Sequence, residues 1–403
     1  MIRSTPQWLI EGLGAGLFAL ALSGCGGGSS GNAALDSASA AGGLSAPARL
    51  GEAIFKDASL SASGRLSCST CHDPASAHAP ANALAAQAGG VLQNVQGHRG
   101  APSIRYLSFN SAFRFAADGT PTGGFFWDGR AGSLQDQAAR PFLTAHELAN
   151  VSIAEVVSKL ARASYAAEFQ QVFGADIFSR PDDAFARVAF ALQQYQREDA
   201  EFHPFSSRYD DFLRGTASLS AQEVRGLALF NNADKGNCAG CHPSGKAADG
   251  SHPLFTDFSY DNLGVPRNPE LAQNDDPAFF DLGLCARDGG DLAARADLCG
   301  AFKVPSLRNV ARRGALFHNG RFKTLKEALT FYVQRDTDPD KWYPRQADGS
   351  VDKFDDLPLI YRRNVNTAEA PYNRRPGDAP ALGDAEIDDL IAFLKTLNDA
   401  DAR

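Results

Sequence analysis

Hydrophobic side chains recur at helical spacing in two segments, one near the middle of the chain and one close to its end. In the first, predicted as a helix over 182–197, the residues that share a face are Phe185, Val188, Ala189, Leu192 and Tyr195. In the second, predicted over 384–397 with Asp384 as N-cap, they are Ile387, Leu390, Ile391 and Leu394. Because the alternation typical of strands is scarce, the pattern predicts a mainly α protein with long loops.

A short hydrophobic motif followed by CxxCH occurs twice. Gly51–Phe55 (GEAIF) precedes Cys68–His72 (CSTCH), and Gly226–Phe230 (GLALF) precedes Cys238–His242 (CAGCH). Each copy is typical of a short helix, then a loop, then the cysteine motif. Such self-similarity indicates that one structural unit is present in two copies.

The second copy also carries a helix-start signal, because Ser220 and Glu223 have the spacing of a capping box. Together with the repeat, the helices predict two tandem helical domains, 47–205 and 206–403. The length of 403 residues agrees with two or three domains.

Composition narrows the class of function. Hydrophobic residues make up 44% and charged residues 21%, which is ordinary for a globular protein. The formal net charge is −8 and no run of Lys or Arg occurs, so nucleic acid is not an expected partner. Met1 is the single methionine, so a mature chain that has lost it can offer no thioether ligand to a metal.

The N-terminus is typical of an export signal. The apolar run Leu13–Leu22 is too short to span a bilayer but suits a signal peptide over 1–24. Leu22–Cys25 (LSGC) resembles a bacterial lipoprotein cleavage box, which makes Cys25 the predicted lipidation site. The alternative is a plain secretory signal with an incidental cysteine. Residues 25–46 are Gly/Ser/Ala-rich and predict a flexible linker.

These features predict a periplasmic protein that is lipid-anchored and contacts the membrane only through its anchor. The periplasm is oxidising, so disulfides form and persist there. Cys285 and Cys299 bracket a polar loop, so we expect a disulfide between them. Closing a loop of this size contributes about 3 kcal/mol by the chain-entropy estimate. With the CxxCH cysteines also engaged, no thiol remains for nucleophilic catalysis.

CxxCH is the attachment signature of c-type haem. Two thiols add to the haem vinyl groups, and the adjacent histidine becomes the proximal iron ligand. The predicted attachment cysteines are Cys68, Cys71, Cys238 and Cys241, with His72 and His242 as iron ligands. The alternative is a zinc site that joins both CxxC pairs. Two copies in a repeated context favour two covalent haems.

With these motifs the chain resembles the bacterial di-haem cytochrome c peroxidases and MauG proteins over about 47–400. The resemblance also rests on the blocks at 125–138 (FFWDGRAGSLQDQA), 302–310 (FKVPSLRNV) and 317–332 (FHNGRFKTLKEALTFY). It implies two tandem cytochrome c-like domains, each carrying one covalent haem. It also implies that peroxide reacts at the first haem.

By register with that family, Trp127 lies between the haems, while Gln137, Pro141 and Glu147 line the peroxide pocket. The resemblance implies that Glu147 moves the protons that O–O cleavage requires. Without the resemblance, the alternative for Glu147 is a solvated carboxylate on a loop. The alternative for Trp127 is a side chain that anchors the core.

Three histidines offer competing assignments. His146, beside Glu147, is a rival acid–base group or iron ligand. His78 and His98 are candidates for a sixth ligand on the first haem. None stands where the family motif places that function, so we expect an open first haem.

Tyr332 is the predicted axial ligand of the second haem. Most family peroxidases have methionine at the matching position, whereas MauG has tyrosine. Thr324 and Glu327 predict a helix start, and one face of that helix holds Leu325, Ala328, Leu329 and Tyr332. The alternative is a core tyrosine. A phenolate ligand favours oxidised iron, which suits a haem that holds oxidising equivalents.

A calcium ion is a further candidate cofactor. By the resemblance, its ligands include an asparagine side chain that is Gly100 here, together with the carbonyls of Arg313 and Ala315. The loss of the asparagine oxygen and the positive charge of Arg313 both weaken this prediction.

The leading hypothesis is a MauG-like di-haem peroxidase that activates hydrogen peroxide and oxidises a partner protein. One alternative is a conventional peroxidase that takes electrons from a small cytochrome c or cupredoxin. An alternative of another class is a non-catalytic electron-transfer cytochrome, which would gain nothing from an acid–base group beside an open haem.

Overall fold

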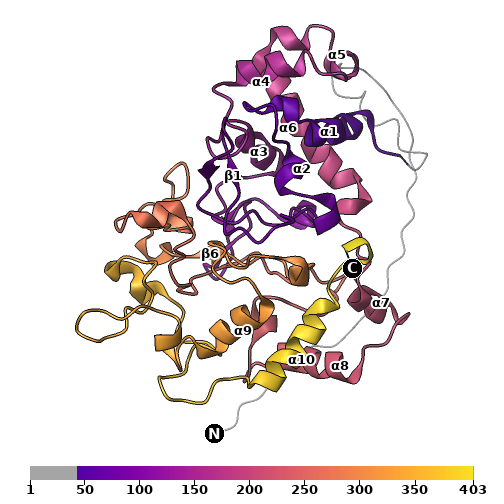
Figure 1. Cartoon of the computed structure of the whole chain (residues 1–403). Coiled ribbons are helices and arrows are strands. Elements are labelled where there is room, and N and C mark those ends of the chain that lie inside the picture. Colours follow the sequence, from indigo (N-terminus) through magenta and orange to yellow (C-terminus); the bar gives the residue numbers. More distant parts are fainter. Residues whose placement is uncertain (1–42, 403) are drawn as a thin grey trace, which may run out of the picture. The chain divides into compact units, whose positions relative to one another are not determined.

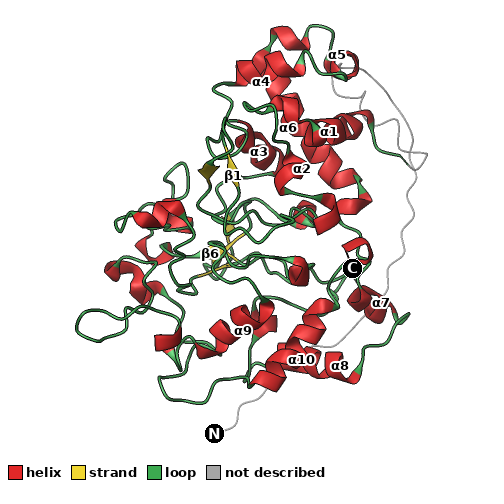
Figure 2. Ribbon diagram, viewed as in Figure 1, coloured by secondary structure: helices red, strands yellow, loops and turns green. Residues whose placement is uncertain are grey.

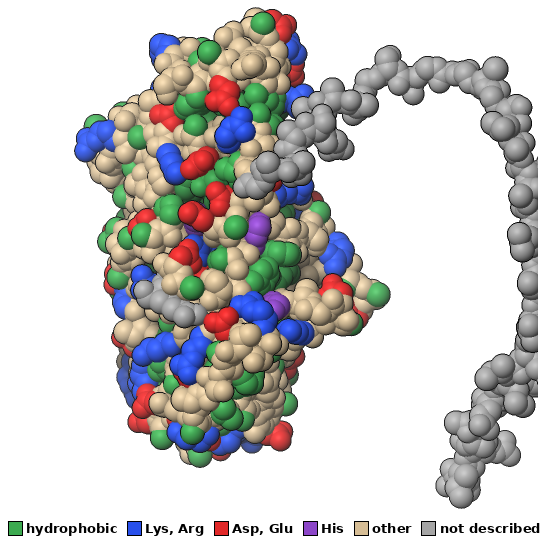
Figure 3. Space-filling model, turned by 90° about the vertical axis from the view of Figure 1, so that its right-hand side faces the viewer, with side chains coloured by type: hydrophobic (Ala, Val, Ile, Leu, Met, Phe, Trp, Pro, Cys, Tyr) green, Lys and Arg blue, Asp and Glu red, His purple; other side chains and the backbone are tan. Residues whose placement is uncertain are grey.

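The computed structural model describes residues 43–402. The predicted signal peptide, Cys25 and the linker as far as residue 42 lie outside the described residues. Within 43–402, no helix is both long and apolar enough to cross a membrane. On the described part of the face in Figure 3, basic and acidic side chains are intermingled.

The first half of the chain contains helices α1 to α6, joined by long loops (Figure 1). Their bounds are α1 Ala46–Lys56, α2 Cys68–Cys71, α3 Leu134–Ala139, α4 Ile153–Leu160, α5 Ala166–Phe173 and α6 Pro181–Glu198. The long helix α6 packs against α1, α3 and α4. It therefore forms the centre of this group of helices.

The second half contains helices α7 to α10. Their bounds are α7 Arg208–Arg214, α8 Ala221–Asn231, α9 Leu325–Gln334 and α10 Asp384–Lys395. Helix α10 packs against α8 and α9. The capping boxes predicted at Ser220 and Thr324 are confirmed as the starts of α8 and α9.

Among residues 43–402, strands form three antiparallel pairs of two residues each (Figure 2). The pairs are β1 Ala88–Gly89 with β2 Val95–Gln96, β3 Arg114–Phe115 with β4 Pro121–Thr122, and β5 Tyr260–Asp261 with β6 Phe302–Lys303. The prediction that strands are scarce agrees with this structure.

The glycine of the repeated motif has the same structural role in both copies. A Cβ on Gly51 of α1 would lie 2.0 Å from the carbonyl oxygen of Ala191 on α6. A Cβ on Gly226 of α8 would lie 2.1 Å from the carbonyl oxygen of Asp389 on α10. Each helix that precedes a CxxCH therefore crosses its long partner so closely that only glycine fits.

Two hydrophobic clusters hold these helix pairs. The first includes Leu50, Phe55, Val188, Tyr195 and Phe202. The second includes Tyr209, Phe230, Ile387, Phe393 and Leu397. The predicted domain boundary at 205/206 falls between the last residue of the first cluster and the first residue of the second. Both clusters belong to one compact unit that begins at Gly43.

The predicted terminal helices differ from the observed ones in detail. Helix α6 covers the predicted 182–197 with one more residue at each end. The N-cap assigned to Asp384 is wrong, because Gly383 is the N-cap and Asp384 is the first helical residue of α10. Glu386 accepts the amide of Gly383 at 2.9 Å, so its carboxylate satisfies the helix start in place of an Asp384 cap.

Buried polar contacts tie segments distant in sequence. Arg308 forms two hydrogen bonds of 2.9 Å to the carboxylate of Asp210, and both side chains are almost fully buried. Asp399, just after α10, accepts from Tyr106 at 2.7 Å and from Arg105 at 3.1 Å. These contacts join the C-terminal segment to the first half of the chain. Separately, Cys285 and Cys299 are joined in a disulfide.

Candidate functional site

Each CxxCH motif lines a cavity of its own. Cavity 1, of about 280 Å³, is lined by Cys68, Cys71 and His72. Cavity 2, of about 200 Å³, is lined by Cys238, Cys241 and His242. Each cavity thus brings two thiols and one imidazole to a single space that is lined mainly by apolar side chains.

The local fold fixes the orientation of both histidines. The Nδ1 of His72 lies 3.2 Å from the carbonyl oxygen of His78, and the Nδ1 of His242 lies 2.7 Å from that of Phe255. Since a carbonyl only accepts, Nδ1 carries the proton and donates in each pair. Burial lowers the pKa of His72 to about 4. Both rings can therefore present an unprotonated Nε2, the form in which imidazole binds a metal.

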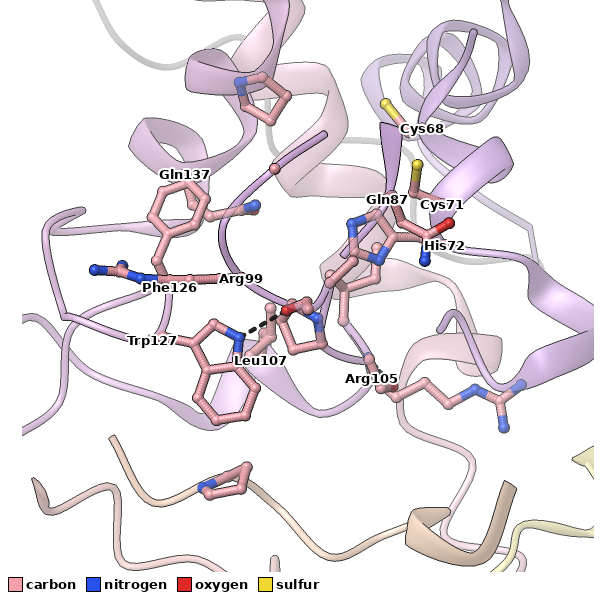
Figure 4. A pocket seen from close by; sticks show the side chains of 18 of the residues that line it. Cys68, Cys71, His72, Gln87, Arg99, Arg105, Leu107, Phe126, Trp127 and Gln137 are labelled. Atoms are coloured by element: carbon pink, nitrogen blue, oxygen red, sulfur yellow. Dashed lines mark hydrogen bonds between the residues drawn. The ribbon is translucent and has the colours of Figure 1, made fainter. Parts of the chain in front are cut away.

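Cavity 1 is also lined by the predicted peroxide-pocket residues. Gln137 on α3, Pro141 and Glu147 all line it. Figure 4 shows Gln137 and Trp127 across the cavity from His72. Burial raises the pKa of Glu147, although the nearby Arg130 guanidinium opposes that shift. A carboxyl group with a raised pKa is suited both to accept and to return a proton.

Arg130 is a cavity residue that the sequence analysis did not single out. It lines cavity 1, and its guanidinium lies 3.7 Å from the centroid of the Phe126 ring. Asp128 accepts from it at 2.9 Å and so holds it in place. The sequence contains a signal that points to Arg130, because this residue lies within the block at 125–138 that carries the family resemblance.

The three candidate histidines differ in whether they line cavity 1. His98 and His146 line cavity 1, with ring centroids 5.8 Å apart. His78 does not line it, because its ring is fully buried and packs 4.2 Å from the Phe202 ring. Its side chain is therefore placed as a core histidine and not as an iron ligand, while its carbonyl orients His72.

A shared wall separates the two cavities. The residues that line both are Trp127, Lys303, Val304, Pro305, Leu307, Val310, Leu316 and Phe317. Trp127 donates its indole Nε1 proton to the carbonyl of Gly100 at 2.8 Å, which fixes the ring in this wall (Figure 4). The aromatic ring thus contacts both spaces.

Helix α9 places Tyr332 on cavity 2. The predicted face, with Leu325, Ala328, Leu329 and Tyr332, lines the cavity throughout. Burial raises the pKa of Tyr332 well above its ordinary value. A phenol in this setting stays neutral at pH 7 unless a cation binds its oxygen. Tyr372 lines the same cavity, with its ring centroid 6.1 Å from that of Tyr332.

Comparison with known proteins identifies the family. Residues 45–218 match the family model described as di-haem cytochrome c peroxidase. The methylamine utilization protein MauG of Paracoccus denitrificans is 36% identical over 361 residues, which cover 87% of this chain and 88% of that protein. The chain belongs to the di-haem cytochrome c peroxidase family. It is therefore an oxidoreductase of the haem peroxidase class.

Two further peroxidases are similar to this chain. The cytochrome c551 peroxidase of Nitrosomonas europaea is 32% identical over 285 residues, covering 70% of this chain and 71% of that protein. The crystal structure of the diheme peroxidase BthA from Burkholderia thailandensis matches with a TM-score of 0.81 and 42% identity. That match covers 88% of this chain and 86% of the other.

The residues present fit the two c-type haems that this di-haem family implies. Each cavity supplies two thiols, a neutral histidine and mainly apolar walls. Burial raises the pKa of Cys71 to about 11, so its thiol is protonated at neutral pH. Such a group is poorly suited to catalysis as a nucleophile.

The residues do not fit the calcium ion considered for this family. Gly100 has no side-chain oxygen, and its carbonyl already accepts from Trp127. Arg313 donates from Nη2 to the carbonyl of Ala101 at 2.9 Å, which places a guanidinium against this segment. A hard divalent cation needs several oxygen ligands and is repelled by a guanidinium.

Proposed function

We propose that this protein is a MauG-like di-haem peroxidase, with one covalent haem in each of the regions 47–205 and 206–403. It activates hydrogen peroxide in cavity 1, passes oxidising equivalents to cavity 2 and oxidises a partner protein. One observation carries the proposal: His72 and the buried carboxyl group of Glu147 line the same cavity. An iron ligand and an acid–base group are the two parts that peroxide cleavage requires.

Cys68, Cys71 and His72 would hold the first haem, and Cys238, Cys241 and His242 the second. The haems supply the redox chemistry, since their irons take up the oxidising equivalents of peroxide. The protein orients each proximal ring through the carbonyl that accepts its Nδ1 proton. This hydrogen bond also raises the basicity of the ligand.

Glu147 moves the protons in cavity 1. Its carboxylate accepts a proton from one peroxide oxygen and returns it to the other, which leaves as water. Gln137 lines the same cavity, where it offers amide donors and orients the peroxide. Pro141 and the ring of Phe126 add apolar surface that limits water. An acid–base group and hydrogen-bond donors in this cavity argue against a simple electron carrier.

Trp127 is the proposed route between the cavities. Its ring lines both, and its hydrogen bond to Gly100 keeps it there. An indole is readily oxidised, and a fixed position avoids reorganisation during electron transfer. Electrons therefore pass from cavity 2 through Trp127 to cavity 1.

Tyr332 distinguishes the MauG-like function from a conventional peroxidase. As a phenolate on the second iron it would stabilise the oxidised state. In a conventional peroxidase the second haem stores an electron delivered by a small cytochrome c or cupredoxin. The likeness to the Paracoccus MauG protein over 87% of the chain supports the first function.

The test adds one equivalent of hydrogen peroxide to the purified two-haem protein and follows absorption and EPR spectra. The proposal expects both haems to become oxidised and to stay so without a donor. Rapid decay together with steady turnover of a reduced cytochrome c would select the conventional peroxidase. A protein that ignored peroxide would be an electron carrier.

We further infer from the sequence that the protein is periplasmic and anchored by a lipid on Cys25. In cells, Cys25→Ser should move the protein from the membrane fraction to the soluble periplasmic fraction. An unchanged distribution would contradict the anchor.

A further inference from the structure

Lys303 is a buried lysine in the wall that the two cavities share. It belongs to strand β6, where its amide donates to the carbonyl of Trp127 at 2.8 Å. Its side chain is only 9% exposed, and its Nζ donates to the carbonyl of Gly124 at 2.8 Å. The same residue lines cavity 1 and cavity 2. The backbone therefore holds one ammonium group at the boundary of both sites.

No side chain among residues 43–402 forms an ion pair with Lys303. The acidic group that acts on it is Asp128, but Asp128 already binds Arg99 at 2.6 Å and Arg130 at 2.9 Å. Asp128 thus already pairs with two guanidinium groups, of which Arg99 also pairs with Asp281 at 2.6 Å. A buried ammonium group without a counter-ion is costly, so it requires an anion from elsewhere.

The two cavities differ in the charges of their described lining residues. Cavity 1 has one acidic residue, Glu147, and five arginines: Arg99, Arg105, Arg130, Arg308 and Arg313. Cavity 2 has four acidic residues, Asp261, Asp281, Asp356 and Glu369, and Lys303 is the one Lys or Arg that lines it. Basic residues other than Lys303 therefore line cavity 1, although four of its five arginines pair with carboxylates. Among the described residues that line cavity 2, the positive charge depends on Lys303.

We propose that Lys303 binds a carboxylate of the cofactors in the shared wall and raises the reduction potentials of both irons. The inference rests on the proposed function, in which each cavity holds a haem. A nearby positive charge favours the reduced state, because each iron gains one electron and loses one positive charge on reduction. Lys303 thereby limits how readily either iron is oxidised. Burial lowers the pKa of Lys303 to about 8, which leaves most molecules charged at pH 7.

The test is spectroelectrochemical titration of the Fe(III)/Fe(II) couples at pH 7 in the two-haem protein. Lys303→Met removes the charge and keeps the chain length, so both potentials should fall. Lys303→Arg keeps the charge and should stay near the wild type. Lys395→Met is the matched control, because Lys395 is an exposed lysine at the end of α10, and neither potential should move.

Haem content, measured by mass spectrometry, separates this inference from the proposed function. A wild-type chain without two haems would overturn the proposed function itself. If two haems are present, unchanged potentials in Lys303→Met would overturn the role of Lys303 alone. A fall in only one of the two potentials would overturn the proposal that Lys303 acts on both irons. Equal falls in Lys303→Met and Lys303→Arg would assign the effect to packing and overturn the role of charge.

Discussion

Trp127 and Gly100 are joined by a hydrogen bond of 2.8 Å from the indole Nε1 to the main-chain carbonyl. The amide of Gly100 in turn donates to the carbonyl of His318 at 2.7 Å. Gly100 thus links the indole to a segment of the second half of the chain. This arrangement places an oxidisable ring in the wall of both cavities.

We expect Trp127→Phe to separate the reactions of the two haems. Phenylalanine fills most of the space but lacks the Nε1 donor and is much harder to oxidise. Peroxide should still react in cavity 1, while oxidation of the second haem slows by at least about tenfold, which corresponds to about 1.4 kcal/mol of barrier. Stopped-flow absorption resolves the two steps. An unchanged second step would exclude Trp127 as the route.

Glu147→Gln tests the acid–base assignment. The amide keeps the shape of the side chain but cannot take up a proton, so peroxide activation should slow by about 10²–10⁴-fold. Glu168→Gln is the control, since Glu168 is an exposed glutamate that pairs with Arg49 on the surface. Equal rates for the wild type and Glu147→Gln would remove this role from Glu147.

The pH dependence of the same step follows from the raised pKa of Glu147. The carboxylate form accepts the first proton, so the rate should rise with pH as Glu147 deprotonates. Because burial raises that pKa, the rise should lie above the ordinary glutamate value of about 4.3. Stopped-flow rates across pH 4–8 measure it, and Glu147→Gln should lose this rise.

Tyr332→Phe should change the absorption and EPR spectra of one haem, because it removes the phenol oxygen that we propose as the ligand of the second iron. Tyr372→Phe is a closely matched control, since Tyr372 lines the same cavity and lies 6.1 Å away between ring centroids. Its spectra should stay close to those of the wild type. The ligand assignment fails if the two variants behave alike.

Asp210→Asn should destabilise the fold through the buried Arg308. Burial alone would raise the pKa of Asp210, but the Arg308 guanidinium holds it well below its ordinary value. Removing the carboxylate charge leaves Arg308 unpaired, which costs about 3–5 kcal/mol of unfolding free energy. Denaturant unfolding measures it, and Asp297→Asn, which breaks an exposed pair with Arg295, should have little effect.

The same pair predicts a pH dependence of stability. The lowered pKa of Asp210 means that its contribution is present above the unfolded value of about 4. It is lost as pH falls below that value through the folded pKa. Asp210→Asn should therefore lose less stability than the wild type between pH 5 and pH 2, a range chosen to span that value of about 4. Equal losses would exclude this carboxylate as a source of acid sensitivity.

Local signals predicted four of the longer helices. Periodicity found α6 and α10, and the capping boxes found the starts of α8 and α9. Such features depend on residues three or four apart, which is the range over which helix geometry operates. The N-cap of α10 was misplaced by one residue because Asp384 and Gly383 both suit a helix start.

The sequence by itself determined the two CxxCH motifs, the family and the absence of methionine after Met1, because each of these is written in neighbouring letters or in a simple count. Only the tertiary structure decided that His78 lies in the core, that Arg130 enters cavity 1 and that Lys303 lies in the wall of both cavities. The physical reason is that burial and charge balance depend on contacts between segments far apart in the chain. Lys303 and Gly124 are 179 residues apart, and no local pattern encodes their contact.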